Sequence, residues 1–171
     1  MTPDPAVAIL RAKPKDLPEI ARLMRLWSTI AWDFMVAHTP DEDLGFIQGR
    51  AEAGVIWVAW EADRIAGFCT VRRGWIDVFH VAPDRHGQGI GRALIARALK
   101  GRLGVRLWTF QRNARARRFY ALQGFRELRV TDGRDNEERE PDVLLEWRRA
   151  KSAFRKVGTG FRDKTRVNKK I

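Results

Sequence analysis

Residues 78–94 have the sequence VFHVAPDRHGQGIGRAL. An apolar run ends at Pro83, a polar turn follows, and a helical pattern begins near Ile90. Gly87, Gly89 and Gly91 stand two residues apart across this turn. Glycine adopts positive φ without strain and allows another group to approach the backbone closely. The free N–H groups of such a turn, with the positive end of the helix dipole, suit an anion such as a pyrophosphate.

This turn differs from two other phosphate-binding turns. The dinucleotide-binding fold needs Gly-x-Gly-x-x-Gly within a βαβ unit, whereas here the spacing is Gly-x-Gly-x-Gly and the turn follows an antiparallel hairpin. A P-loop needs Gly-Lys followed by Ser or Thr, which is missing here. Nicotinamide-dinucleotide and P-loop folds are therefore disfavoured.

The segments around the turn predict an α+β fold. The strand–helix–strand run over 75–110 predicts a right-handed parallel crossover, whereas the hairpin before it and the last strand pair predict antiparallel neighbours. We therefore expect a mixed, mostly antiparallel sheet of six to seven strands with helices on both faces. Strands are expected over 6–11, 55–60, 65–72, 75–81, 105–110, 125–131 and 143–147, and helices from Asp16, from Thr39-Pro40, from Ile90 and over 113–123.

The charge of the chain is concentrated at its C-terminal end. The 171 residues have a formal net charge of +12, of which nine basic residues and one acid over 149–171 contribute +8. Residues 1–148 are then only mildly basic, at +4. We expect one domain over 1–148 and a flexible basic tail over 149–171. The tail is interpreted as a solubilising extension, with a salt-sensitive nucleic-acid contact as the alternative.

Other features of composition exclude several classes of protein. Cys69 is the only cysteine, so neither an internal disulfide nor a cysteine cluster for zinc can form, and no metal is expected. The sequence shows no secretion signal and no run of about 18 apolar residues. We expect a cytoplasmic protein with no membrane partner.

A second informative segment, residues 113–125, has the sequence NARARRFYALQGF. Tyr120 is the only tyrosine of the chain and stands two helical turns after Asn113 on the same helix face. Taken alone, the segment predicts an asparagine helix cap and a tyrosine packed in the core.

Together the two segments resemble the coenzyme-binding half of the GNAT acetyltransferases. The resemblance covers residues 6–147 and is most specific over 75–125. The family motif Arg/Gln-x-x-Gly-x-Gly/Ala matches His86, Gly87, Gln88, Gly89, Ile90 and Gly91, with His86 in place of Arg or Gln. The resemblance implies the acyl-CoA N-acyltransferase fold, acetyl-CoA as cosubstrate, and a backbone cradle for its pyrophosphate in this turn.

The resemblance also implies roles for single residues. Asn113 matches a residue near the pantetheine arm, and Tyr120 matches the proton donor to the leaving thiolate. Val81 matches the residue after a strand bulge, whose amide bonds the thioester carbonyl. Asp77 is the first choice for the base that deprotonates the amine, directly or through water, and His80 is the alternative. A merely salt-bridged Asp77 is also compatible with the sequence.

In this family the first two helices and the loop between the last two strands line the pocket that binds the amine. The loop over 131–142 carries six acids against two arginines, which suits a cationic amine, although a solvated loop has the same composition. The expected function is transfer of acetyl to a primary amine of a small molecule or peptide. The alternative is a non-catalytic acyl-CoA-binding module with a nucleic-acid-binding tail, and a homodimer stays open. The other side chains expected at the pocket are Trp27, Trp32, Phe34 and His38.

Overall fold

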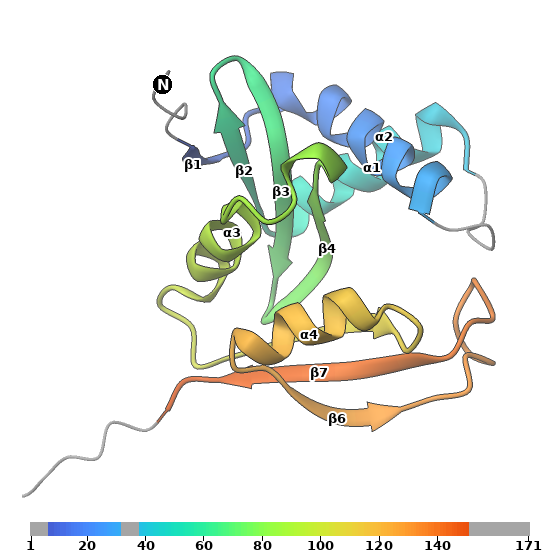
Figure 1. Cartoon of the computed structure of the whole chain (residues 1–171). Helices are drawn as coiled ribbons and strands as arrows, with labels where there is room; N and C mark the ends of the chain where they lie inside the picture. The colour runs from blue at the N-terminus through green and yellow to red at the C-terminus, as the bar shows by residue number, and fades with distance from the viewer. Residues whose placement is uncertain (1–6, 32–37, 151–171) are drawn as a thin grey trace, which may run out of the picture.

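The computed structural model describes residues 7–31 and 38–150, and these form one seven-stranded sheet in the order β1-β2-β3-β4-β5-β7-β6. All neighbouring strands are antiparallel except β4 and β5, which are parallel. The mixed, mostly antiparallel sheet predicted from the sequence is therefore confirmed (Figure 1). The strands are β1 (Ala8–Arg11), β2 (Val55–Glu61), β3 (Arg64–Arg72), β4 (Trp75–Val81), β5 (Gly104–Phe110), β6 (Arg126–Val130) and β7 (Asp142–Arg148).

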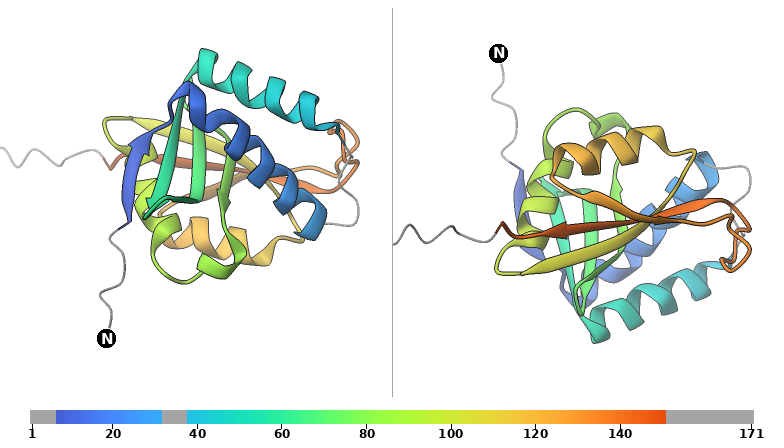
Figure 2. Two further views of the ribbon diagram at one scale, coloured as in Figure 1. Left: turned by 90° about the horizontal axis from the view of Figure 1, so that it is seen from above. Right: turned by 90° about the horizontal axis from the view of Figure 1, so that it is seen from below.

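Helices cover both faces of the sheet, as predicted (Figure 2). The helices α1 and α2 pack on one face, where Ile20, Ile47 and Phe68 are fully buried. The helices α3 and α4 pack on the other, around a core that includes Leu94 and Leu145. Their bounds are α1 (Leu17–Ala31), α2 (Pro40–Ala53), α3 (Ile90–Leu99) and α4 (Ala114–Leu122).

Two helix starts can be compared with the prediction. At α2, the Thr39 hydroxyl accepts from the Glu42 N–H at 3.3 Å, and the Glu42 carboxylate accepts from the Thr39 N–H at 2.6 Å. These two bonds form a capping box at the helix start expected at Thr39-Pro40. At α1 the helix expected from Asp16 begins one residue later, at Leu17. A short 3-10 turn comes first, and Asp16 is buried and accepts from the backbone N–H of Lys13 at 2.7 Å.

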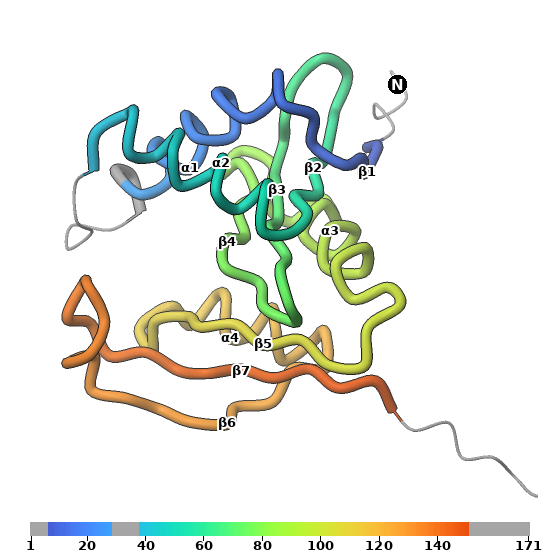
Figure 3. Tube along the Cα trace, turned by 180° about the vertical axis from the view of Figure 1, so that it is seen from behind, coloured from blue at the N-terminus to red at the C-terminus, as the bar shows by residue number. Residues whose placement is uncertain are grey.

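The sheet opens between its two parallel strands. β4 and β5 are paired only at Trp75 and Arg106, although β4 pairs with β3, and β5 with β7, along most of their lengths. Beyond this point the two strands diverge toward their C-terminal ends (Figure 3). The backbone edges of β4 and β5 that face each other therefore have no strand partner there.

The β-bulge expected in β4 lies at a different residue from the one predicted. Thr70 is paired with Val78 and Val71 with Ile76, so Asp77 is the extra residue of a β-bulge. Val81 is paired with Gly67 in regular register. The bulge thus lies at Asp77, four residues before Val81, and the expectation that Val81 follows it directly is wrong.

Candidate active site

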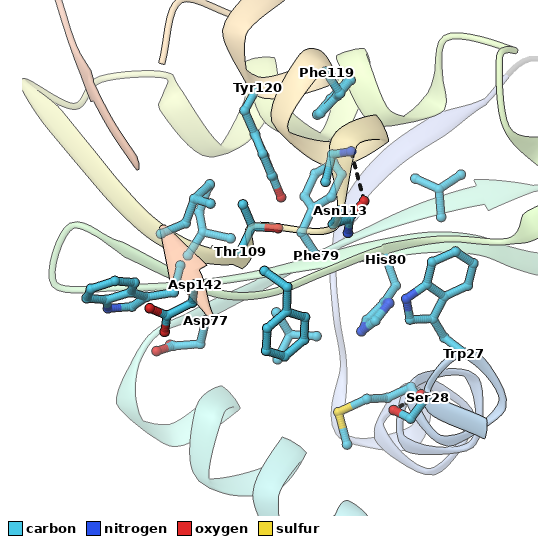
Figure 4. Close-up of a pocket in the computed structure, with 18 of the residues that line it drawn as sticks. Trp27, Ser28, Asp77, Phe79, His80, Thr109, Asn113, Phe119, Tyr120 and Asp142 are labelled. Atoms are coloured by element: carbon cyan, nitrogen blue, oxygen red, sulfur yellow. Dashed lines mark hydrogen bonds between the residues drawn. The ribbon is translucent and has the colours of Figure 1, made fainter. Parts of the chain in front are cut away.

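A cavity of about 1210 Å³ occupies the opening between β4 and β5. The strands form its back, the start of α3 and one face of α4 form one side, and α1, the start of α2 and the β6–β7 loop form the other. Segments far apart in sequence thus meet around one space (Figure 4).

The glycine turn forms one end of the cavity. Gly87 and Gly89 have φ of +82° and +83°, and a Cβ built on either would meet nothing within 4 Å, so open space lies beside both. The first hydrogen bond of α3 runs from the Ala93 N–H to the Gly89 carbonyl. The N–H groups of residues 90–92 precede it and have no acceptor within the helix. The geometry expected of an anion cradle is therefore present.

Two side chains of the motif point away from this end. Ile90 is buried in the core, and Gln88 donates from Nε2 back to the Asp84 carbonyl at 3.1 Å. Ile90 can therefore offer only its backbone to a ligand, and the Gln88 amide nitrogen is bonded within the turn. The turn itself is fixed from outside, because the Arg85 guanidinium pairs with Glu61 at 2.6 Å.

His86 occupies the position where the family motif has Arg or Gln. Its Nε2 lies 2.9 Å from the Val81 carbonyl, and its ring meets Trp27 edge-on at 5.5 Å. Because a carbonyl only accepts, Nε2 carries a proton in this bond. Burial lowers the pKa of the ring below its ordinary value. The side chain therefore joins the turn to the end of β4 and lines the cavity.

Two backbone amides of β4 face the gap. Ala82 donates to the Ala66 carbonyl at 2.8 Å, so the N–H of Ala82 points toward β3. In an antiparallel pair this direction alternates from residue to residue, so the N–H groups of Val81 and Phe79 point the other way, toward β5. β5 does not pair there. Val81 thus has the orientation expected for a carbonyl-binding amide, and Phe79 is a second such group.

Tyr120 is 6% exposed. Its side chain projects from α4 and its hydroxyl points into the cavity (Figure 4). The rings of Phe79, Phe119 and Phe125 surround it at 5.3–6.0 Å. Burial raises the pKa of the hydroxyl above its ordinary value near 10. The phenol therefore stays protonated at neutral pH, as a proton donor requires.

Asn113 caps α4, because its Oδ1 accepts from the Ala116 N–H at 3.0 Å. The residue also lines the cavity, close to Tyr120 and Thr109 in Figure 4. The capping role read from the segment alone is present, and the amide nitrogen Nδ2 is left for a ligand.

Asp77 lines the cavity but is held by two arginines. Its carboxylate accepts from Arg72 at 2.9 and 3.0 Å, and Arg50 lies 3.7 Å from it. The salt-bridged alternative is thus what the structure shows. Arg72 is the last residue of the neighbouring strand β3, and Arg50 comes from α2. The two guanidinium groups and the Asp77 carboxylate therefore meet at the bulge.

His80, unlike Asp77, lies among aromatic rings and has no ion pair among the described residues. Its ring lies 5.4 Å from that of Phe68 and 5.8 Å from that of Trp27, and it lines the cavity. Burial lowers the pKa of His80 to about 4, so the ring is neutral at physiological pH. Its Nδ1 is buried and has no hydrogen-bond partner among the described residues.

Two of the residues expected on the acceptor side line different parts of the cavity. Trp27 lies beside His80 and His86, whereas the imidazole of His38 lies 3.6 Å from Glu137 of the β6–β7 loop. Trp32 and Phe34 fall outside the described residues. The loop residues that line the cavity are Thr131, Asp135, Asn136, Glu137, Glu138 and Asp142.

Some lining residues were not singled out from the sequence. Phe119 stacks on Phe79 at 5.6 Å, and a Cβ on Gly91 would lie 3.4 Å from its ring. The signal for Phe119 was its helical spacing, since α4 turns one face to the cavity at intervals of three and four residues. Arg92 and Arg115 add positive charge beside the glycine turn.

Comparison with known proteins agrees with this geometry. Residues 52–127 match the family described as "Acetyltransferase (GNAT) domain". Comparison of the sequence with curated proteins gives no match. Over residues 52–127 the chain is therefore similar to GNAT acetyltransferase domains, and this match does not identify an acceptor.

Solved structures share the fold. YjaB from Escherichia coli in its apo form is 23% identical with a TM-score of 0.67, covering 83% of this chain and 97% of that one. YncA of Salmonella typhimurium, a putative acetyltransferase solved with its cofactor acetyl-CoA, is 17% identical with a TM-score of 0.69, covering 84% and 94%. The ribosomal-protein-S18-alanine N-acetyltransferase of E. coli is 20% identical with a TM-score of 0.64, covering 84% and 94%.

Within residues 7–31 and 38–150, no group of three or more His, Cys, Asp or Glu side chains is arranged to hold a metal ion. Within the same part of the chain, no helix has the length and apolar character needed to cross a membrane.

Proposed function

We propose that this protein transfers the acetyl group of acetyl-CoA to a primary amine. The observation that carries the proposal is the convergence on one cavity of three groups: the cradle at Gly87–Gly91, the free amides of β4 and the Tyr120 hydroxyl. An acyl transfer needs a site for the coenzyme, donors for the developing oxyanion and an acid for the leaving group. Each of these is supplied here by a different element.

The cradle binds the pyrophosphate through backbone N–H groups, and Asn113 offers Nδ2 to the pantetheine arm. The amides of Val81 and Phe79 donate to the thioester carbonyl oxygen, on which negative charge develops as the amine nitrogen attacks the carbon. Fixed donors of this kind typically change rates by about 10²–10³. Tyr120 gives its proton to the sulfur as the carbon–sulfur bond breaks, and regains it from solvent.

The amine must lose a proton as the new carbon–nitrogen bond forms. Asp77 is the first choice for this step, and its pairing with Arg72 and Arg50 favours action through a water molecule over direct contact. His80 is the alternative. Its low pKa makes it a weak base but leaves it free to accept a hydrogen bond from the amine.

The competing function is a non-catalytic module that binds acyl-CoA and attaches to nucleic acid through residues 149–171. The two differ in the fate of the thioester. With acetyl-CoA at saturation, an enzyme releases free thiol only when a suitable amine is added, at a rate that depends on the amine. A binding module takes up acetyl-CoA in calorimetry but releases no thiol above background with any polyamine, aminoglycoside or peptide tested. That second pattern would contradict the proposed activity.

A further inference from the structure

The two ends of the cavity carry opposite charge. Arg92 and Arg115 line the end at the glycine turn. Asp135, Glu137 and Glu138 of the β6–β7 loop line the other end. This loop lies beside the end of α1 and the start of α2 in two views (Figures 2 and 3), in agreement with the contact between His38 and Glu137.

The loop holds these acids in place. Gly133 has a φ of +80°, and a Cβ there would lie 2.3 Å from the backbone carbon of Glu140, so the two arms of the loop touch. Asn136 donates from Nδ2 to the Glu140 carbonyl at 2.8 Å. At the base, Gln111 donates to the Thr131 carbonyl at 2.7 Å. The segment that carries the acids is therefore fixed at its base and across its width.

Not all acids of the loop are available to a ligand. Asp132 pairs with Arg134 at 2.9 Å, and Glu140 with Arg112 at 2.8 Å. Asp142 accepts from Thr131 and Asn136. Asp135 and Glu138 form no ion pair with any described residue, and Glu137 meets only the imidazole of His38 among them. Among the loop acids that line the cavity, Asp142 is thus satisfied by neutral partners, whereas Asp135, Glu137 and Glu138 have no guanidinium or ammonium partner among the described residues.

Inside the cavity, His80 supplies an independent indication of a ligand. Its Nδ1 is buried without a partner among the described residues, and its ring points into the space shown in Figure 4. A buried polar nitrogen is normally paired. A primary amine has both N–H groups and a lone pair, so it can satisfy Nδ1 in either tautomer of the neutral ring.

We propose that the acceptor is an amine that carries a second positive charge. The carboxylates of Asp135, Glu137 and Glu138 hold that charge at the mouth, while the reacting nitrogen lies against His80. The inference rests on the proposed acetyl transfer and names its substrate class. A diamine and a peptide with a basic residue near its N-terminus share this chemistry.

The test compares kcat/KM for 1,4-diaminobutane with that for butylamine, which has the same chain length and one charge. Exposed ion pairs are weak, so each carboxylate contributes about a two- to fivefold preference. We expect the wild type to prefer the diamine, and Asp135→Asn combined with Glu138→Gln to lose most of this preference by raising KM for the diamine alone. Asp132→Asn is the matched control, because Asp132 is on the same loop but outside the cavity lining.

The same comparison is made with two peptides that have lysine or norleucine as their second residue. It distinguishes a peptide acceptor from a small diamine. Charge preference in either the diamine or the peptide pair, lost in the double variant, supports the proposal. Equal use of charged and neutral acceptors by the wild type would overturn it, as would a preference that the double variant retains. Absence of acetylated product with every amine would overturn the proposed function, and this inference with it.

Discussion

The ring of Tyr120 is packed among three phenylalanines while its hydroxyl faces the cavity, so packing and chemistry can be separated at this residue. Tyr120→Phe keeps the ring and removes the proton. We expect turnover to fall by about 10²-fold or more, because a general acid contributes about 10²–10⁴. Acetyl-CoA affinity in calorimetry and the melting temperature should change little. Turnover within a few-fold of the wild type would reduce Tyr120 to a packing residue.

The sequence could predict which residue types line the cavity but not how each is engaged. The roles expected of Tyr120 and Asn113 came from the family resemblance, and their spacing alone only placed both on one helix face. The ion pair between Asp77 and Arg50 joins a strand to α2, and the bond from His86 to Val81 depends on how the turn folds back. Contacts of this kind depend on tertiary packing, which the local pattern does not contain.

At the scale of elements, the turn before α3 can be tested with two glycines in the same conformation. Gly89 has φ +83° at the start of α3, and Gly101 has φ +79° just after its end; neither has an atom within 4 Å of a built Cβ. Alanine at either position should cost about 1–2 kcal/mol of stability through positive φ. Only Gly89→Ala places a methyl group where the pyrophosphate is proposed to bind. We expect its acetyl-CoA affinity to fall at least about tenfold in calorimetry.

Gly101→Ala should keep wild-type affinity and serves as the control for strain. Equal acetyl-CoA affinities of the two variants would show that the glycine turn does not bind the coenzyme.

The bounds of the helices and strands were largely predictable, because prolines and glycines interrupt the chain at most of them, as Pro83 and Gly124 do. The bulge at Asp77 was misplaced, since an extra residue in one strand shows only in the register with its partner.

In the molecule as a whole, the opening of the sheet between β4 and β5 creates the cavity. No single segment of the sequence predicts this opening. The parallel order of β4 and β5 followed from the crossover through α3, but their divergence after Trp75 and Arg106 did not. The distribution of charge, in contrast, is a direct property of the sequence. It places +8 in residues 149–171 and +4 in the remainder.

This distribution predicts the effect of truncation after Arg149. The cut keeps β7 and the hydrogen bond from the Arg149 N–H to the Leu103 carbonyl at 2.9 Å. We expect the melting temperature and acetylation of small amines to stay nearly unchanged. If residues 150–171 bind nucleic acid, the full chain should be retained on RNA or DNA at low salt and the truncated chain should not, with affinity falling steeply as salt rises. Equal retention of both would exclude that role.

Transfer of an acetyl group from acetyl-CoA to an amine in this cavity is tested most directly by following the acetyl group itself. The purified full-length protein is incubated with acetyl-CoA labelled in its acetyl carbons and with diamine or peptide acceptors, and products are identified by mass spectrometry. We expect labelled N-acetyl product in a one-to-one ratio with released thiol, and about 10²-fold less of both with Tyr120→Phe. Thiol release without labelled amine, or no release in the presence of bound acetyl-CoA, would contradict acetyl transfer to an amine.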